Sequence, residues 1–182
     1  MSTLTGGTAL CTPLDHLVGE IRGVVGRRLS VQRTADAVGG LLQPVLSEPG
    51  LLTDAQRQGD PACYRQHVLH VEPDGSFSVV ALVWLPGQAT AIHDHVSWCT
   101  VGIYEGRETE TRYRVAGPKG RRRLVEDGGC VNRPGEVSAV APPGDIHKVA
   151  NSGTGTAISL HVYGADVLRL GSSIRRTYDH DA

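Results

Sequence analysis

The 182-residue sequence has no C-x-x-C pair, almost no net charge and no long hydrophobic run. Its cysteines, Cys11, Cys63, Cys99 and Cys130, are widely separated, which argues against a zinc–thiolate site and a dense disulfide framework. With 18 basic and 19 acidic residues, the formal net charge is -1, so no overall field attracts nucleic acid or an anionic membrane. No apolar stretch is long enough to span a bilayer. These absences favour a reducing compartment and a small-molecule partner, not nucleic acid or a membrane.

The N-terminal segment MSTLTGGTALC also lacks the basic start and apolar run of a secretion signal. A chain of this length is typical of one domain and can bury roughly 70% of its unfolded surface without disulfides or metals. We therefore expect a single cytoplasmic domain that is a monomer or a small homo-oligomer.

The first 60 residues have a helical pattern. Thr12 can cap a helix whose first turn contains Pro13. The apolar residues that follow recur at helical spacing and form one stripe: Leu14, Leu17, Val18, Ile21, Val24 and Val25. A second helix is predicted from about Ser30 to Leu42, with weakening at Gly39-Gly40 and at Pro44.

After Asp60 the pattern changes to short β-branched runs separated by turn residues, such as HVLHV, FSVVALVWL and TAISLHVY. Asp74-Gly75 is typical of a tight hairpin turn, and GPKGRRR at 117–123 is typical of the tip of a longer hairpin. Many short strands with glycine turns indicate a mainly β sandwich or small barrel. We expect one structural domain, in which residues 1–60 are a helical segment packed outside a barrel formed by residues 61–182.

Two histidines lie one residue apart in AIHDHVSWCTVGIYEG, residues 91–106. Because side chains alternate along a strand, His93 and His95 should share one face while Asp94 points to the other. His147, in PPGDIHKVAN, is a third candidate facing the barrel interior. Three neutral imidazoles without a carboxylate would hold a metal and leave positions open on it. The histidines of an isolated H-x-H pair are at least as often surface or core residues as metal ligands, so the flanking residues must be considered.

Those flanking residues resemble the two motifs of the cupin superfamily. Gly87 precedes His93 by six positions, and Gly106 closes the following strand. A P-x-G-x-x-H-x-x-x-N pattern occupies residues 142–151. The resemblance implies a cupin fold, a double-stranded β-helix or jelly-roll barrel, with the helices outside.

Cupins normally carry a glutamate ligand after the second histidine, but this chain has Cys99 there. In this respect it resembles the thiol dioxygenases of the cysteine dioxygenase family, which bind Fe²⁺ through three histidines alone. The family has a Ser-His-Tyr triad beside the iron, and Ser159, His161 and Tyr163 match it on one strand face. Without the histidine motifs, these three residues would read as the solvent-facing side of an ordinary strand. The resemblance spans roughly residues 60 to 165.

Cys99 has two interpretations. Mammalian members of the family join a cysteine in this region to the triad tyrosine through a thioether, which would link Cys99 to Tyr163 here. That cysteine follows the second histidine after four residues, whereas three intervene in this chain, and many bacterial members have glycine at this place. A plain buried thiol is the alternative.

The resemblance implies that a small thiol and O2 are the partners. A thiol bound to Fe²⁺ loses its proton because the cation stabilises the thiolate. Both oxygen atoms can then reach the sulfur and give a sulfinate. Tyr163, ordered by His161 and Ser159, would donate a hydrogen bond in the site or position the substrate.

The first strand of the resemblance bears on the substrate. Cysteine-specific members carry Tyr-x-Arg there, whereas this chain has Tyr64-Arg65-Gln66. If Tyr64 faces the pocket, Gln66 does so too and Arg65 points outward, as in the 3-mercaptopropionate dioxygenases, which have glutamine here. A register shift of one residue would restore Arg65. Three tail arginines could supply the cation that a substrate carboxylate prefers: Arg169, Arg175 and Arg176.

Two other functions are compatible with the histidine motifs. One is a cupin enzyme that uses zinc, manganese or nickel as an isomerase or hydrolytic enzyme, because imidazoles alone do not select iron. The other is a cupin that binds a small molecule without catalysis. The Ser-x-His-x-Tyr pattern at 159–163 favours the dioxygenase over both.

Overall fold

The computed structural model describes residues 11–119 and 121–179, so most of the N-terminal segment assessed for a secretion signal lies outside the described residues. The helices are α1 (Pro13–Val25), α2 (Val31–Val45), the 3-10 helix η1 (Asp54–Arg57) and α3 (Val167–Leu170). The strands are β1 (Arg65–Val71), β2 (Ser78–Trp84), β3 (Ile92–His95), β4 (Cys99–Glu105), β5 (Glu108–Ala116), β6 (Arg123–Asn132), β7 (Val137–Val140), β8 (His147–Ala150), β9 (Ala157–Tyr163) and β10 (Ile174–Tyr178). Within the described ranges, no helix combines the length and the apolar character needed to cross a bilayer.

Helix α1 begins where the sequence predicts. The Thr12 side chain accepts a hydrogen bond from the Asp15 N–H, and the Asp15 carboxylate accepts one from the Thr12 N–H, which forms a capping box. Pro13 occupies the first turn, where its missing N–H costs nothing. The apolar stripe is buried: Leu17, Val18, Ile21 and Val24.

Helix α2 corrects one expectation, because it continues through Gly39, Gly40 and Pro44 to Val45 without a break. Gly39 lies at a close contact with the barrel: a Cβ there would be 3.3 Å from a methyl group of Val137. The Thr100 hydroxyl of β4 also donates to the Ala35 carbonyl at 2.9 Å. Tertiary packing against the sheet therefore overrides the low helix propensity of the glycines.

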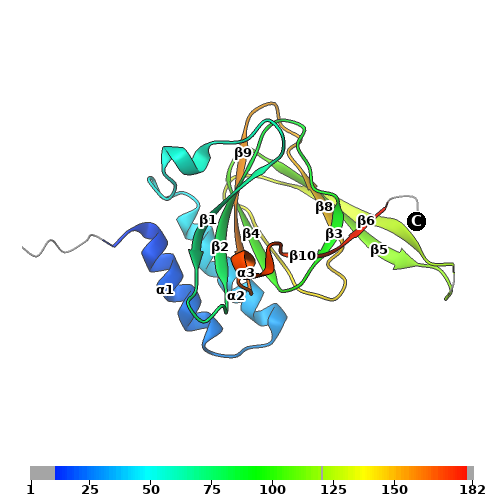
Figure 1. The fold of residues 1–182 in the computed structure, drawn as a ribbon, viewed down its shortest axis with the longest axis horizontal. Coiled ribbons are helices and arrows are strands. Elements are labelled where there is room, and N and C mark those ends of the chain that lie inside the picture. The colour runs from blue at the N-terminus through cyan, green and yellow to red at the C-terminus, as the bar shows by residue number, and fades with distance from the viewer. Residues whose placement is uncertain (1–10, 120, 180–182) are drawn as a thin grey trace, which may run out of the picture.

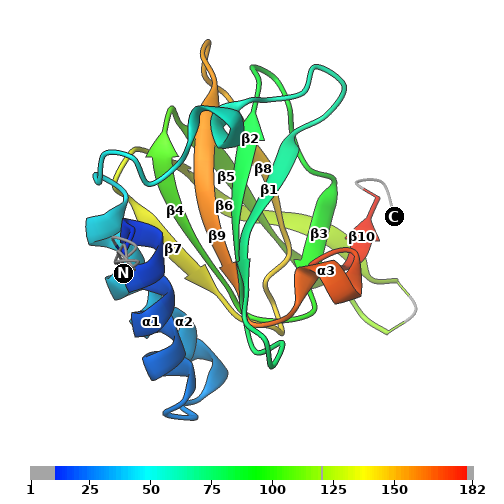
Figure 2. The ribbon, with the colours of Figure 1, turned by 60° about the vertical axis from the view of Figure 1, so that its left-hand side comes forward.

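The ten strands form two five-stranded antiparallel sheets, in the orders β1-β2-β9-β4-β7 and β10-β3-β8-β5-β6. Neighbours that are distant in sequence, such as β2 and β9, show that the chain crosses repeatedly from one sheet to the other. The sheets face each other, and α1 and α2 cover the outer side of the first one (Figure 1 and Figure 2). The mainly β cupin fold predicted from the sequence is confirmed.

Strands β2 and β9 are buried along their whole length because both of their faces are covered. One face packs against the helices in a cluster with α1 and α2: Val79, Ala81, Val83, Ile158, Leu160 and Val162. The opposite face points into the barrel: Val80, Leu82, Trp84, His161 and Tyr163. Alternation along these strands therefore separates an apolar outer layer from an inner layer that includes polar residues.

Both predicted hairpin turns are present. Gly75 adopts a left-handed φ of 75° between β1 and β2, and the Asp74 carboxylate accepts a hydrogen bond from the Ser76 N–H. Residues 117–123 connect β5 to β6, and this hairpin projects away from the helices (Figure 1). Gly120, within its tip, lies outside the described residues.

Two glycines of the first histidine motif differ in their surroundings. Gly106 has a φ of 72°, and a Cβ there would lie 2.5 Å from the Thr156 carbonyl oxygen and 2.7 Å from the Ala157 Cα. Gly87 has a φ of 81°, but a Cβ there would meet nothing within 4 Å. Both positions require a left-handed backbone, but only Gly106 lacks room for a side chain.

We therefore predict that Gly106→Ala destabilises the protein far more than Gly87→Ala. The left-handed backbone should cost each variant about 1 to 2 kcal/mol, and the clash with strand β9 should bring the cost at Gly106 to about 3 to 5 kcal/mol. Urea unfolding of both variants measures the difference. Equal losses in the free energy of unfolding would contradict the close approach at Gly106.

Candidate active site

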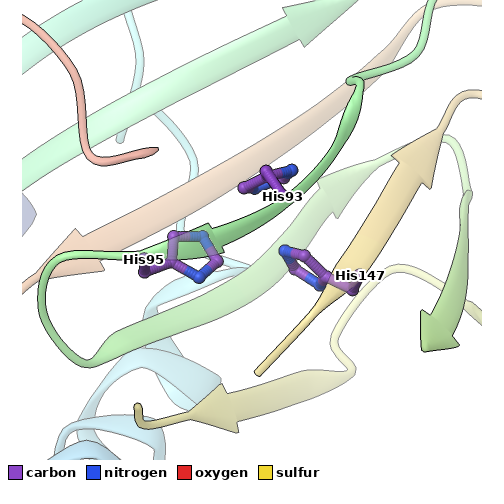
Figure 3. A group of neighbouring side chains, drawn as sticks. All are labelled: His93, His95 and His147. Atoms are coloured by element: carbon purple, nitrogen blue, oxygen red, sulfur yellow. The ribbon is translucent and has the colours of Figure 1, made fainter. Parts of the chain in front are cut away.

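Three histidine side chains converge inside the barrel (Figure 3). His93 and His95 come from β3, and His147, which is paired opposite His93, comes from β8. All three are buried, and one nitrogen from each lies within 4.8 Å of the others. The His93 Nδ1 faces the Ala91 carbonyl oxygen at 3.0 Å. A carbonyl can only accept, so this contact places the ring proton on Nδ1 and leaves Nε2 with its lone pair.

Carboxylates orient the other two rings in the same way. The Asp145 Oδ2 accepts from the His95 Nδ1 at 3.0 Å and also from the His95 backbone N–H. The Glu110 Oε1 accepts from the His147 Nδ1 at 2.8 Å. In both carboxyl groups burial would raise the pKa, but the hydrogen bonds and charges around each group, those of the histidine foremost, together lower it. Ionised carboxylates behind the rings fix the tautomer that a metal requires.

The donor set fits a divalent transition metal. Burial, reinforced by the neighbouring His147, lowers the pKa of His93 to about 4, so this imidazole is neutral at neutral pH. The hydrogen bonds at Nδ1 leave the Nε2 atom of each ring available to a metal, and imidazole is a ligand that iron, zinc, copper and nickel accept. No carboxylate or thiolate joins this cluster of ligand atoms among the described residues.

Asp94, between the two β3 histidines, points to the opposite face. Its carboxylate accepts hydrogen bonds from Arg175, Arg176 and Tyr178 of β10. Burial alone would raise the pKa of Asp94, but these donors together lower it to about 2. The ion pairs tie β3 to β10 and hold the short histidine strand in register.

Ser159, His161 and Tyr163 form a hydrogen-bonded chain beside the histidines. The His161 Nε2 lies 2.9 Å from the Ser159 Oγ, and the His161 Nδ1 lies 3.1 Å from the Tyr163 hydroxyl. The indole N–H of Trp84 donates to the Ser159 Oγ at 3.1 Å. Burial lowers the pKa of His161 to about 3, so the imidazole is neutral. The chain connects the barrel interior with the cavity next to the metal ligands.

A small cavity of about 30 Å³ lies over the three histidines. Tyr163, His161, Tyr64 and Gln66 are among the residues that line it. Tyr64 stacks on Trp84 with a distance of 4.4 Å between the ring centroids. The remaining lining is partly apolar and partly hydroxyl-bearing: Leu82, Val101, Val149, Ile174, Thr90, Ser172 and Ser173.

The cavity lies on the Gln66 side of β1, not on the Arg65 side. Gln66 pairs with Leu82, which faces the barrel interior, whereas Arg65 pairs with Val83, which faces the helical layer. Arg175 is bound to Asp94 outside the barrel, and neither Arg175 nor Arg169 lines the cavity.

Comparison with known families gives a clear result. The family model for cysteine dioxygenase type I matches residues 56–169, more than half of the chain. The chain belongs to this family. The matched region includes the three clustered histidines, Gln66 and the hydrogen-bonded residues Ser159, His161 and Tyr163. Of the site described above, only the residues after α3 lie outside it.

Two curated cysteine dioxygenases type 1 are similar to this member of the family. The Danio rerio protein is 28% identical over 112 residues, which cover 60% of this chain and 56% of that protein. The Homo sapiens protein is 30% identical over 92 residues, which cover 50% of this chain and 46% of that protein. The chain therefore spans about half the length of the curated relatives it matches.

Among solved structures, a cupin superfamily protein from Desulfitobacterium hafniense is similar over 60% of this chain and 84% of its own length. The TM-score is 0.45 and the sequence identity is 16%.

Two buried acids of the site, Asp145 and Glu110, were not predicted from the sequence. Asp145 stands two residues before His147 in PPGDIH, where it reads as part of a turn. Glu110 lies in a β5 run of alternating Glu and Thr that resembles a solvated strand face. Its contact with His147 depends on the pairing of β5 with β8, which no local pattern predicts. One signal was available for Glu110: it is an acidic residue at an inward position of a strand that lies next to a strand with a predicted metal ligand.

We predict that Asp145→Asn weakens metal binding about 10- to 100-fold, because an amide holds the His95 ring less strongly than a carboxylate does. Competition with a coloured chelator measures the affinity for Fe²⁺ or Co²⁺. Asp127→Asn, at an exposed ion pair with Arg114, is the matched control and should leave the affinity unchanged. Full affinity in Asp145→Asn would show that the ring needs no such support.

Proposed function

We propose that this protein is a non-haem iron thiol dioxygenase that oxidises a small thiol to its sulfinate with O2. The carrying observation is the set of three buried histidines whose Nδ1 atoms are engaged in hydrogen bonds, next to a hydrogen-bonded tyrosine in one cavity. Membership of the cysteine dioxygenase type I family supports the same reading. Bound by these histidines, Fe²⁺ would stabilise the substrate thiolate and activate O2 for reaction at the sulfur.

The residues around the ligands have separate tasks. Burial raises the pKa of Tyr163 well above its usual value, so its hydroxyl stays protonated and can donate a hydrogen bond into the cavity. His161 holds that hydroxyl in place. Leu82 and Val149 line the cavity with apolar surface, which limits water near the reacting sulfur.

The far end of the thiol would meet uncharged donors. Gln66 presents its amide, and Ser172 and Ser173 present hydroxyl groups at the same cavity. We propose a substrate of the 3-mercaptopropionate type, in which these groups bind the carboxylate by neutral hydrogen bonds. Cysteine is the alternative substrate, and its amino group would add a charge that the described cavity lining does not pair.

The test is O2 uptake by protein loaded anaerobically with Fe²⁺. We expect thiol-dependent uptake, with one sulfinate formed per O2 consumed and the highest kcat/KM for 3-mercaptopropionate among that thiol, cysteine, cysteamine and mercaptosuccinate. Gln66→Ala should raise the KM for 3-mercaptopropionate about 10-fold with a smaller change in kcat. Arg65→Ala, on the other face of β1, is the control. Uptake with none of the four thiols would favour a cupin that uses another metal or has no catalysis.

Cys99 and Tyr163 are direct partners across β4 and β9, and both are buried. This register supports the proposal of a thioether between the Cys99 sulfur and the Tyr163 ring. Burial raises the pKa of the Cys99 thiol, which favours the plain thiol as the alternative.

The thioether predicts that part of the Cys99 population resists alkylation in denaturant and that the intact mass of this part is lower by two hydrogen atoms. Peptide mapping would then recover the two segments as one linked species. In Cys99→Ser the linked species should vanish. Alkylation of Cys99 in every molecule would establish the plain thiol.

A further inference from the structure

One buried carboxylate has no part in the chemistry described above. Glu108, the first residue of β5, is 1% exposed, and its Oε1 has no hydrogen-bond partner among the described residues. The neighbouring buried acids each hold a specific group: Asp94 binds β10, Glu110 binds His147, and Asp145 binds His95 through Oδ2. A buried carboxylate oxygen without a hydrogen-bond partner is costly, so the presence of Glu108 requires an explanation.

Glu108 lies at the inner end of the Ser-His-Tyr chain. Burial raises its pKa to about 7, hydrogen bonds from Ser159 and Trp84 oppose this rise, and the charge of Glu110 on the same strand adds to it. From β9, the Tyr163 hydroxyl also interacts with the charge of Glu108. The carboxyl group can therefore gain or lose a proton near neutral pH.

An unbroken series of polar atoms joins Glu108 to the cavity. Ser159 contacts Glu108 and lies 2.9 Å from the His161 Nε2, and the His161 Nδ1 lies 3.1 Å from the Tyr163 hydroxyl, which lines the cavity. Each member of the series can accept one proton and pass on another. A neutral imidazole does so by exchanging its two tautomers, so His161 need not become charged.

We propose that Glu108 is the terminal acceptor of the proton that the substrate thiol loses on binding. This inference rests on the proposed function. The thiol proton passes to the Tyr163 oxygen, the Tyr163 proton to the His161 Nδ1, the proton on Nε2 to the Ser159 oxygen, and the Ser159 proton to the Glu108 carboxylate. A thiol and a carboxylate become a thiolate and a carboxylic acid, with no proton exchanged with water.

The transfer also reverses every hydrogen bond along the series. With Glu108 ionised, Ser159 donates toward Glu108 and Tyr163 donates toward His161. With Glu108 protonated, the Tyr163 hydroxyl is free to donate into the cavity. The tyrosine therefore becomes a donor at the reacting centre only after the substrate has given up its proton.

Net proton release on thiol binding tests the inference without turnover. Anaerobic Fe²⁺-loaded protein is titrated with 3-mercaptopropionate by calorimetry at pH 7.5, in buffers of different ionisation enthalpy. Because a group with a pKa near 7 is about three-quarters ionised at this pH, the unmodified protein should release roughly a quarter of a proton per thiol. Glu108→Gln should release about one proton. Release of about one proton by both proteins would overturn the proposal.

The control is Glu126→Gln, at an exposed position of β6, which should match the unmodified protein. The unmodified protein also provides a test that needs no variant. Its proton release should rise from roughly a quarter at pH 7.5 to about nine-tenths at pH 6, where Glu108 is already protonated before the thiol arrives. Release near one proton at both values would also overturn the proposal, even if Glu108→Gln does not fold.

The outcomes separate this inference from the proposed function. Thiol-dependent O2 uptake together with full proton release at pH 7.5 would leave the dioxygenase in place and remove Glu108 from its mechanism. Absence of both thiol binding and O2 uptake would overturn the proposed function, and the role of Glu108 with it.

Discussion

The alternation of side chains along β3 is the constraint on which the site depends. A strand sends neighbouring residues to opposite faces, so His93 and His95 point into the barrel while Asp94 points out. The outward carboxylate is bound by Arg175 and Tyr178 of β10, which fixes the strand in its sheet. A shift by one residue would bury the acid among the imidazoles and expose both ligands, so the ion pairs outside protect the geometry inside.

The polar and apolar residues of the barrel are arranged so that the metal ligands are held in place by hydrogen bonds. The histidines donate outward, to a carbonyl and to carboxylates, and present lone pairs inward. The outer faces of β2 and β9 are apolar and lie under the helices. Their inner faces carry Trp84, Ser159 and His161, whose hydrogen bonds satisfy one another. Polar side-chain atoms are thus buried mainly where each finds a partner, and the two exceptions among the described residues are Glu108 Oε1 and Asp145 Oδ1.

The sequence predicted what periodicity and local spacing determine. The capped helix at Thr12, the mainly β barrel and the common face of His93 and His95 all follow from patterns within a few residues. The acids Glu110 and Asp145 could not be predicted as supports of the ligands, because their contacts depend on which strands become neighbours. The prediction that α2 weakens at Gly39 was wrong for the same reason. Close packing on the sheet, and not helix propensity, determines that the helix continues.

The lining of the cavity comes from two kinds of segment. The metal ligands are on β3 and β8, deep within a hydrogen-bonded sheet, whereas Ser172 and Ser173 follow α3 in a short connection at the end of the fold. The asymmetry gives the barrel a modular character. Substitutions in that connection would change which small molecules fit the cavity. The metal ligands, held by cross-strand pairing, would keep their positions.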